Sequence, residues 1–160
     1  MRALRHTRNV GLNGEAVVLD RIFGKAKENR DINRLIHDIA DHQRTADYRE
    51  LLARLPKLTL YFPVSQAAAG NLPRGERIQV PSGSNIPLPA VTIDGRTHVL
   101  LYASKSDNRL DPGVAEIDGT EALRMVLRIP NSGGLVIQAE GTAWVGIERD
   151  KVAYVLQSVA

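Results

Sequence analysis

The densest group of potential metal ligands in this sequence is HDIADH, at residues 37–42. Imidazole and carboxylate side chains four positions apart lie on one face of a helix, where a pair of them could bind one divalent cation. The apolar residues of this segment repeat with a helical period, which places His37, Asp38 and Asp41 on the opposite face. His42 points in another direction, so four ligands do not converge. We therefore expect a solvent-exposed helix face and no metal site.

His98, Ser104, Ser106 and Asp107 are the residue types of a hydrolase triad. A general base activates the serine in such enzymes, and in the α/β-hydrolase type the serine occupies a sharp turn between glycines. No glycine pattern of this kind surrounds Ser104 or Ser106. We therefore predict that the protein is not an enzyme, and we expect His98 to be a surface or a satisfied, half-buried side chain.

The glycines in NSGGLVI, residues 131–137, raise the question of a phosphate-binding loop. Phosphate-binding glycines precede a helix, because the amides at the helix N-terminus supply the anion site. Here the glycines follow a predicted helix and precede a predicted strand. We therefore expect Gly133 or Gly134 to cap the helix C-terminus with a positive φ angle.

The composition is that of an ordinary globular domain that lacks several kinds of chemistry. The chain has 160 residues, of which 43% are hydrophobic, 24% are charged and 4% are aromatic, and it has no cysteine. The absence of cysteine excludes disulfides, thiol catalysis and cysteine-ligated zinc. No apolar run approaches the ~20 residues that span a bilayer, and the basic start is not followed by the apolar run of a secretory signal. We expect a soluble, cytoplasmic protein without a cofactor or a membrane partner.

Positive charge is concentrated at the start of the chain. Residues 1–30 contain seven Lys or Arg against three Asp or Glu. Nucleic-acid binding normally draws on a clustered basic face, and binding of single strands adds aromatic side chains for base stacking. The first arginines have no interleaved aromatic residues, so we do not expect a nucleic-acid partner. We expect residues 1–30 to form a basic leader with a short helix over 15–29, and residues 31–160 to form the folded domain.

Hydrophobic periodicity predicts the elements that must position these side chains. Asp31 and Thr45 are candidate N-caps of two successive helices, and Pro56 ends the second. Asp118 and Glu121 resemble a capping box before a later helix. The expected helices cover residues 31–55 in two parts, 120–129 and, after a cap at Asp150, 152–160. The expected strands cover 58–64, 77–80, 86–88, 91–93, 98–103, 135–139 and 142–147, with mostly loop over 65–89 and a polar, turn-rich stretch over 104–119.

The order of these elements predicts the fold class. Helices come before, between and after the strands, and several strand connections have the length of hairpin turns, including Asp94-Gly95. This order favours an α+β fold over a doubly wound parallel sheet. We expect a mixed or mostly antiparallel sheet of about five to six strands flanked by helices, with a single layer of helices on at least one face.

Three blocks of the chain resemble the N-terminal domain of the SseB family of bacterial proteins. They are LTLYFPV at 58–64, HVLLYASKSDNRL at 98–110, and GGLVIQAEGTAWVGIERDKVAYVL at 133–156. The chain departs from the family pattern at 102–104, where Tyr-Ala-Ser replaces Phe-Thr-Ser, and at 138–139, where Gln-Ala replaces Asn-Pro. The family has no established chemistry, so the resemblance implies a bacterial interaction or scaffold module.

The function expected from the sequence is therefore non-catalytic binding of a protein partner or of a second copy of the chain. Trp144 lies on an alternating strand, and by parity its side chain points away from Val145 and Ile147. Either a helix covers that face and makes Trp144 part of the core, which we favour, or the side chain is exposed as an interface anchor. The alternative function is a small-molecule-binding domain or an unrecognised enzyme with the 65–89 loop as a lid. The candidate interaction surface consists of Tyr61, Pro63, Asn71, Arg74, Tyr102, Ser104 and Trp144.

Overall fold

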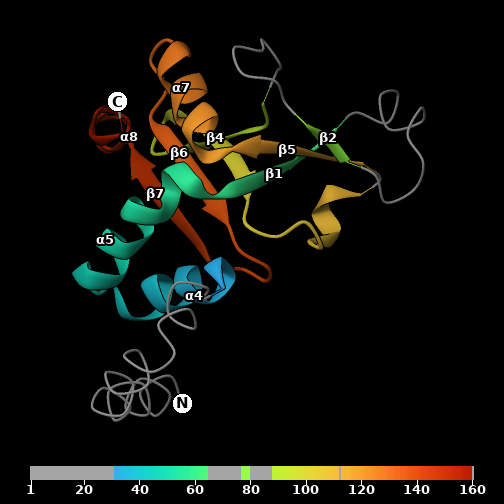
Figure 1. The fold of residues 1–160 in the computed structure, drawn as a ribbon, viewed down its shortest axis with the longest axis horizontal. Helices are drawn as coiled ribbons and strands as arrows, with labels where there is room; N and C mark the ends of the chain where they lie inside the picture. The colour runs from blue at the N-terminus through green and yellow to red at the C-terminus, as the bar shows by residue number, and fades with distance from the viewer. Residues whose placement is uncertain (1–30, 65–76, 80–87, 112, 160) are drawn as a thin grey trace.

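Figure 1 shows the computed structural model, which describes residues 31–64, 77–79, 88–111 and 113–159. The predicted helix over 15–29 lies outside the described residues, as does most of the 65–89 segment. The strand expected over 86–88 is not formed at Leu88, its one described residue. The domain boundary placed at residue 30 therefore stays a prediction.

The described residues form a seven-stranded mixed sheet, and six of its strands lie in the order β2-β5-β1-β4-β6-β7. The seventh strand, β3, pairs with β4 on the side of β4 that also pairs with β1. The β2/β5 and β4/β6 pairs are parallel and the other four pairs are antiparallel. The α+β class is thereby confirmed. The strands are β1 (Thr59–Pro63), β2 (Arg77–Gln79), β3 (Ala90–Ile93), β4 (Arg96–Tyr102), β5 (Val114–Asp118), β6 (Gly134–Gln138) and β7 (Trp144–Glu148).

One face of this sheet carries the α-helices. They are α4 (Ile32–His42), α5 (Thr45–Arg54), α7 (Gly119–Arg128) and α8 (Arg149–Ser158), and two short 3-10 helices are η1 (Leu55–Lys57) and η2 (Asn108–Leu110). All four α-helices contribute to a single hydrophobic core against one set of alternate strand residues. In Figure 1, β1 lies between α7 and η2, so η2 is on the other side of the sheet. Fully buried members of the core include Leu35, Leu51, Leu123, Val152, Leu60, Leu101, Ile117, Ile137 and Ile147.

The first two helices form largely as their sequence predicts. The Asp31 carboxylate accepts a hydrogen bond of 3.1 Å from the backbone N–H of Asn33, which confirms this residue as the N-cap of α4. Thr45 is not a cap, because it is the first residue of α5 and the preceding Arg44 occupies the cap position. The Arg44 side chain instead pairs with Asp47 of the first turn at 2.9 Å.

Neither of the later helices uses its predicted cap. Asp118 occupies the N-cap position of α7, but its side chain accepts no capping hydrogen bond. Glu121 is buried and pairs with Arg128 at 2.7 Å. Helix α8 begins at Arg149, with Glu148 and not Asp150 at its N-cap.

The C-terminus of α7 is capped by an arginine from another helix and not by a glycine. The Arg149 guanidinium donates hydrogen bonds of 2.8–3.1 Å to the carbonyl oxygens of residues 126, 127 and 129 and to Ser132 Oγ. The predicted glycine cap is wrong, since the positive φ after the helix belongs to Asn131. Gly134, with φ of +139°, is the first residue of β6, where a Cβ would collide with the carbonyl oxygen of Ile147.

Strand β5 is a strand that the sequence pattern did not indicate. It lies inside the segment expected to be polar and turn-rich, yet all five of its residues pair with β1. Ala115 and Ile117 are buried on the helix-bearing side, and the alternate residues Val114, Glu116 and Asp118 are half-buried or exposed. The strand is short and only two of its side chains enter the core, which explains the weak signal.

Candidate functional site

Tyr61, Tyr102, Gln138 and Trp144 form a row across four adjacent strands. Tyr61 of β1 is opposite Tyr102 of β4, Tyr102 is opposite Gln138 of β6, and Gln138 is opposite Trp144 of β7. Side chains alternate between the faces of a sheet, and the chain neighbours Leu60, Leu101 and Val145 belong to the helix-covered core. The row therefore lies on the opposite side, which we call the outer face.

Trp144 is the most exposed aromatic residue of this row. The residue is 47% exposed, whereas Val145 and Ile147 on the other face are buried, which confirms the predicted parity of the strand. The preference for Trp144 as a core residue was wrong, because none of the described α-helices covers the outer face. The indole lies over the neighbouring Gly146, where an added Cβ would be 3.5 Å from Cζ3 of the ring.

Tyr102 is buried on the outer face, and so it is not the free surface residue that the sequence suggested. Tyr102 is only 8% exposed. The guanidinium carbon of Arg109 lies 5.4 Å from the centre of the Tyr102 ring, which is a cation–π distance. Leu110 of η2 is fully buried outside the main core. The η2 segment therefore covers the outer face near Tyr102 and leaves the β7 end of the row exposed.

The other predicted surface residues fall in three groups. Tyr61 and Pro63 are half-buried on the same face of β1, and Pro63 is the last residue of the strand, as its missing N–H predicts. Ser104 is half-buried and shares a hydrogen bond of 2.8 Å with Ser106. Asn71 and Arg74 lie outside the described residues.

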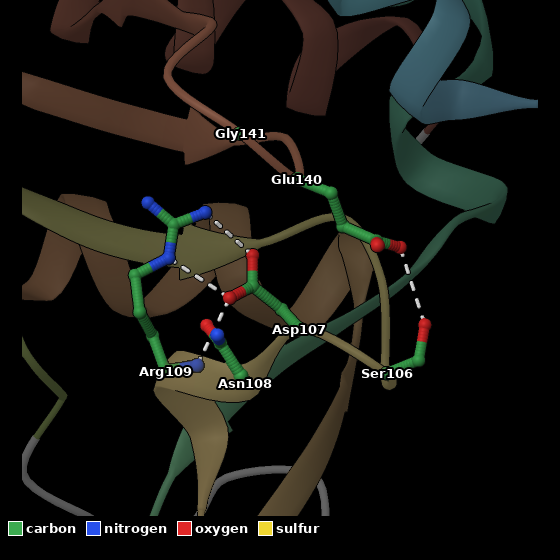
Figure 2. Close-up of a pocket in the computed structure, with 6 residues that line it drawn as sticks. All are labelled: Ser106, Asp107, Asn108, Arg109, Glu140 and Gly141. Carbon is green, nitrogen blue, oxygen red and sulfur yellow. Dashed lines mark hydrogen bonds and ion pairs between the residues drawn. The ribbon is translucent and has the colours of Figure 1, made fainter.

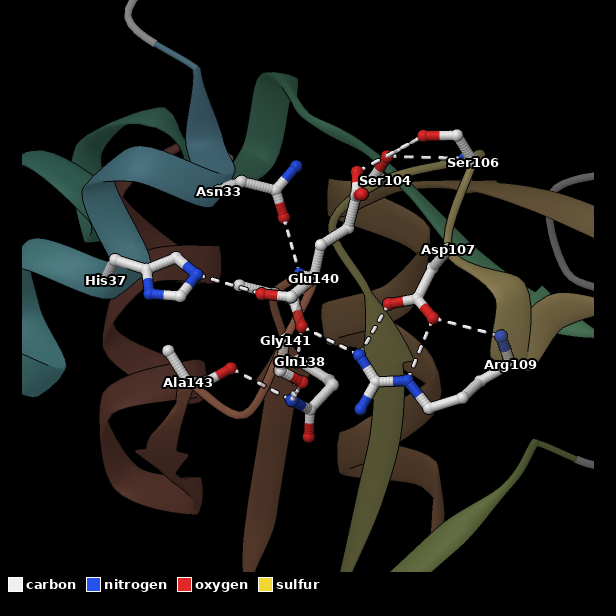
Figure 3. Close-up of polar contacts among 11 residues, drawn as sticks. Asn33, His37, Ser104, Ser106, Asp107, Arg109, Gln138, Glu140, Gly141 and Ala143 are labelled. Atoms are coloured by element: carbon white, nitrogen blue, oxygen red, sulfur yellow. Dashed lines mark hydrogen bonds and ion pairs between the residues drawn. The ribbon is translucent and has the colours of Figure 1, made fainter.

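The turn between β6 and β7 is held by α4 on one side (Figure 3). The Asn33 amide oxygen accepts a hydrogen bond of 2.9 Å from the Glu140 N–H, and His37 Nε2 donates one of 2.8 Å to the Glu140 carbonyl oxygen. The prediction that His37 is simply solvated is therefore wrong, because this side chain is half-buried and fastens the turn. Asp41 is exposed, as predicted.

The η2 segment holds the same turn from the other side. Arg109 Nη2 donates a hydrogen bond of 2.9 Å to the Ala139 carbonyl oxygen, and Ser106 Oγ donates one of 3.2 Å to the Glu140 carboxylate. Asp107 orients Arg109 by accepting bonds of 2.8 Å from Nε and 2.7 Å from Nη2. These bonds hold the pKa of the buried Asp107 carboxyl below its usual value, and in return they raise the pKa of Arg109.

A polar pocket of about 420 Å³ opens between the η2 segment and this turn (Figure 2). It lies where the parallel strands β4 and β6 end, which in open α/β sheets is a common place for ligands. Most of its polar groups bind one another, however, so the pocket is held by an internal network and is not lined with free ligands. Its walls are formed by Ser106, Asp107, Asn108, Arg109, Glu140 and Gly141. The sequence signal that could have identified it is the Asp107-Asn108-Arg109 turn, whose Asp caps η2.

The described residues contain no assembled catalytic triad. His98 is half-buried and donates a hydrogen bond of 3.0 Å from Nδ1 to the carbonyl oxygen of Arg96, as a satisfied histidine. It lies toward the start of β4, whereas Ser104 and Ser106 follow the end of that strand and bond each other. Over the described ranges, no group of three or more His, Asp or Glu side chains could hold a metal ion.

No protein-family model, curated protein or solved structure matches this chain. The resemblance to the SseB family therefore stays a prediction. Among the helices that the structure describes, none has the length and apolar character needed to cross a membrane.

Proposed function

We propose that this protein is a non-catalytic interaction module of the bacterial cytoplasm, of the kind that the SseB-like blocks imply. It binds a protein partner through the β7 end of the outer face. The observation that carries this proposal is the 47% exposure of Trp144 at the end of a cross-strand row. Tryptophan is enriched among the residues that dominate binding energy at protein interfaces.

The scaffold behind Trp144 is suited to binding without chemistry. Strands β6 and β7 pair over five residues, and the turn that joins them is fastened by Asn33 and His37 on one side and by Arg109 on the other. A rigid surface loses little conformational entropy when it binds, which favours affinity. Asn33, His37 and Arg109 are occupied in holding the turn.

Site-specific photo-crosslinking tests the proposal. A photoreactive phenylalanine analogue replaces Trp144 in one full-length variant and Tyr154 in a matched control, because Tyr154 is an aromatic residue of α8 that is 68% exposed on the helical layer. Irradiation in native lysate should give one dominant adduct from position 144 and none from position 154. Equal labelling from both positions, or no adduct at all, would contradict the proposal.

A second candidate function is the binding of a small polar molecule in the pocket beside η2. Its volume of about 420 Å³ falls within the range of ligand sites, and the Asn108 side chain and Arg109 Nη1 have no hydrogen-bond partner among the described residues. A panel of charged metabolites should then raise the melting temperature of the natural protein and not of an Asn108→Ala variant. No stabilisation by any of them would remove this candidate.

A further inference from the structure

Strand β7 is the last strand at one edge of the sheet among the described residues, and α4 packs against it. Among these residues, β7 pairs with β6 alone (Figure 1). Ala139 N–H bonds to the Ala143 carbonyl oxygen at 2.9 Å, and Arg149 N–H bonds to that of Gly133 at 3.1 Å, so the odd-numbered residues of this strand direct their backbone groups toward β6. The N–H and C=O groups of Trp144 and Gly146 must then point away from the sheet.

These outward backbone groups form a template for an added strand. Within the described part of the chain, the structure gives the backbone N–H and C=O groups of Trp144 and Gly146 no hydrogen-bond partner. Proteins usually protect such edges with Lys, Pro or a bulge. Strand β7 has neither residue, and its five pairs with β6 run without interruption. Gly146 presents no side chain, and the Trp144 indole lies over it on the outer face.

The charge that β7 itself carries is acidic. Glu148, the one charged residue of β7, and Asp150, just after the strand, are both exposed, whereas the Glu140 carboxylate is bonded to Ser106 in the pocket beside η2. Of the basic residues nearby, Arg149 turns its guanidinium inward to the carbonyl oxygens at the end of α7, whereas Lys151 is exposed and Arg96 lines a pocket with Glu148 and Asp150. A second copy of this chain would bring the same carboxylates to the edge, whereas a basic segment would complement them.

We propose that the β7 edge binds an extended basic segment of a partner protein as an added strand, with an apolar side chain of that segment packed on Trp144. The proposal rests on the proposed function and specifies its mode. Backbone hydrogen bonds to Trp144 and Gly146 would supply affinity, and contacts with Trp144 and Glu148 would supply specificity.

Two synthetic peptides test this mode with the full-length chain. One alternates Lys with Val over about eight residues, slightly longer than a typical strand, and the other has Glu in place of each Lys. Titration followed by Trp144 fluorescence should show binding of the basic peptide at least about tenfold tighter than of the acidic one, a difference of about 1.4 kcal/mol. Hydrogen exchange should slow at the amides of Trp144 and Gly146. Equal affinities, or protection confined to other strands, would overturn the proposal.

Gly146→Pro tests the backbone contact directly. The change removes an outward N–H, not one that pairs with β6, and the φ of Gly146 is not positive, so the fold should be kept. We expect at least about a tenfold loss of peptide affinity with an unchanged circular dichroism spectrum. Unchanged affinity in a folded variant would overturn the proposal. Should this variant not fold, Glu148→Lys provides the second test, because it should reverse the preference between the two peptides.

The outcomes separate this inference from the proposed function. If a partner still crosslinks to position 144 in a folded Gly146→Pro variant, the result supports the proposed interaction module and overturns the proposal that the partner binds as an added strand. Concentration-dependent dimerisation that protects the Gly146 amide without peptide would identify a second copy as the occupant, and it would also overturn the basic-peptide proposal. Absence of an adduct from position 144, together with absence of peptide binding to the natural chain, would remove both proposals.

Discussion

The guanidinium of Arg109 donates two parallel hydrogen bonds to the carboxylate of Asp107, of 2.8 Å from Nε and 2.7 Å from Nη2. The Asp107 side chain is 2% exposed, whereas that of Arg109 is 38% exposed. Because the same guanidinium also bonds to the Ala139 carbonyl oxygen, this pair connects the segment after β4 to the turn after β6. The pair therefore holds together the two segments that form the pocket.

Asp107→Asn should lower the free energy of unfolding at neutral pH. It should also make that free energy change less as the pH falls. The Arg109 hydrogen bonds keep the folded-state pKa of Asp107 below the value of about 3.9 of an unfolded aspartate, so its contribution is present above that pH and is lost as the pH falls. We expect a loss of about 2 kcal/mol in unfolding free energy at pH near 7. Urea denaturation between about pH 3 and 7 measures both effects, and the exposed Asp111→Asn is the matched control, which should change stability by less than about 0.5 kcal/mol.

Arg149→Met should destabilise the end of α7. The substitution keeps much of the aliphatic chain and removes the donors that satisfy three backbone carbonyl oxygens and the buried Ser132 hydroxyl. Losing these hydrogen bonds to a charged donor costs stability, here about 2 kcal/mol, although Ser132 still bonds to the carbonyl oxygens of residues 126 and 129. Thermal denaturation should show a clear fall in melting temperature, against little change for Lys151→Met, an exposed neighbour in the same turn. Equal effects of the two changes would show that the cap contributes nothing.

The unfolding free energy of the protein should fall at alkaline pH because of Tyr48. Burial is the main cause that raises its pKa, and the charges of Glu148 and Asp150 raise it further. The folded state therefore holds this proton more tightly than the unfolded chain, whose tyrosine pKa is about 10, and stability falls as the pH rises above that value. Tyr48→Phe should lose less stability than the natural protein between about pH 9 and 11 in urea denaturation. Tyr154→Phe, at a residue 68% exposed, should lose as much as the natural protein.

Gly134→Ala should be far more harmful than Gly95→Ala. Both glycines have positive φ, at +139° and +77°, but a Cβ at Gly95 meets nothing within 4 Å whereas one at Gly134 meets the backbone of β7. We expect a loss of about 1 kcal/mol at Gly95 from backbone conformation alone. The loss at Gly134 should be about 3 kcal/mol, because the strands must shift. Similar losses in chemical denaturation would contradict the close packing of β6 on β7 at this point.

The sequence by itself determined the elements whose hydrophobic pattern is complete within one segment. The stripe of Leu35, Ile36 and Ile39 with its Asp31 cap defined α4, and the Asp94-Gly95 turn, with φ of 50° and 77°, defined the β3–β4 hairpin. The alternation around Trp144 also indicated which way the indole points. Each of these features depends on neighbours a few residues away, so a local pattern is sufficient to encode it.

The tertiary structure alone decided which residues meet. Strand β5 is stabilised by pairing with β1, more than fifty positions earlier in the chain, and its own residues carry little signal. Tyr61, Tyr102 and Trp144 form a row because the registers of three strand pairs align them, and His37 fastens a turn 103 positions away in the chain. Strand order and register depend on how distant segments share one core, and no short stretch of sequence contains that information.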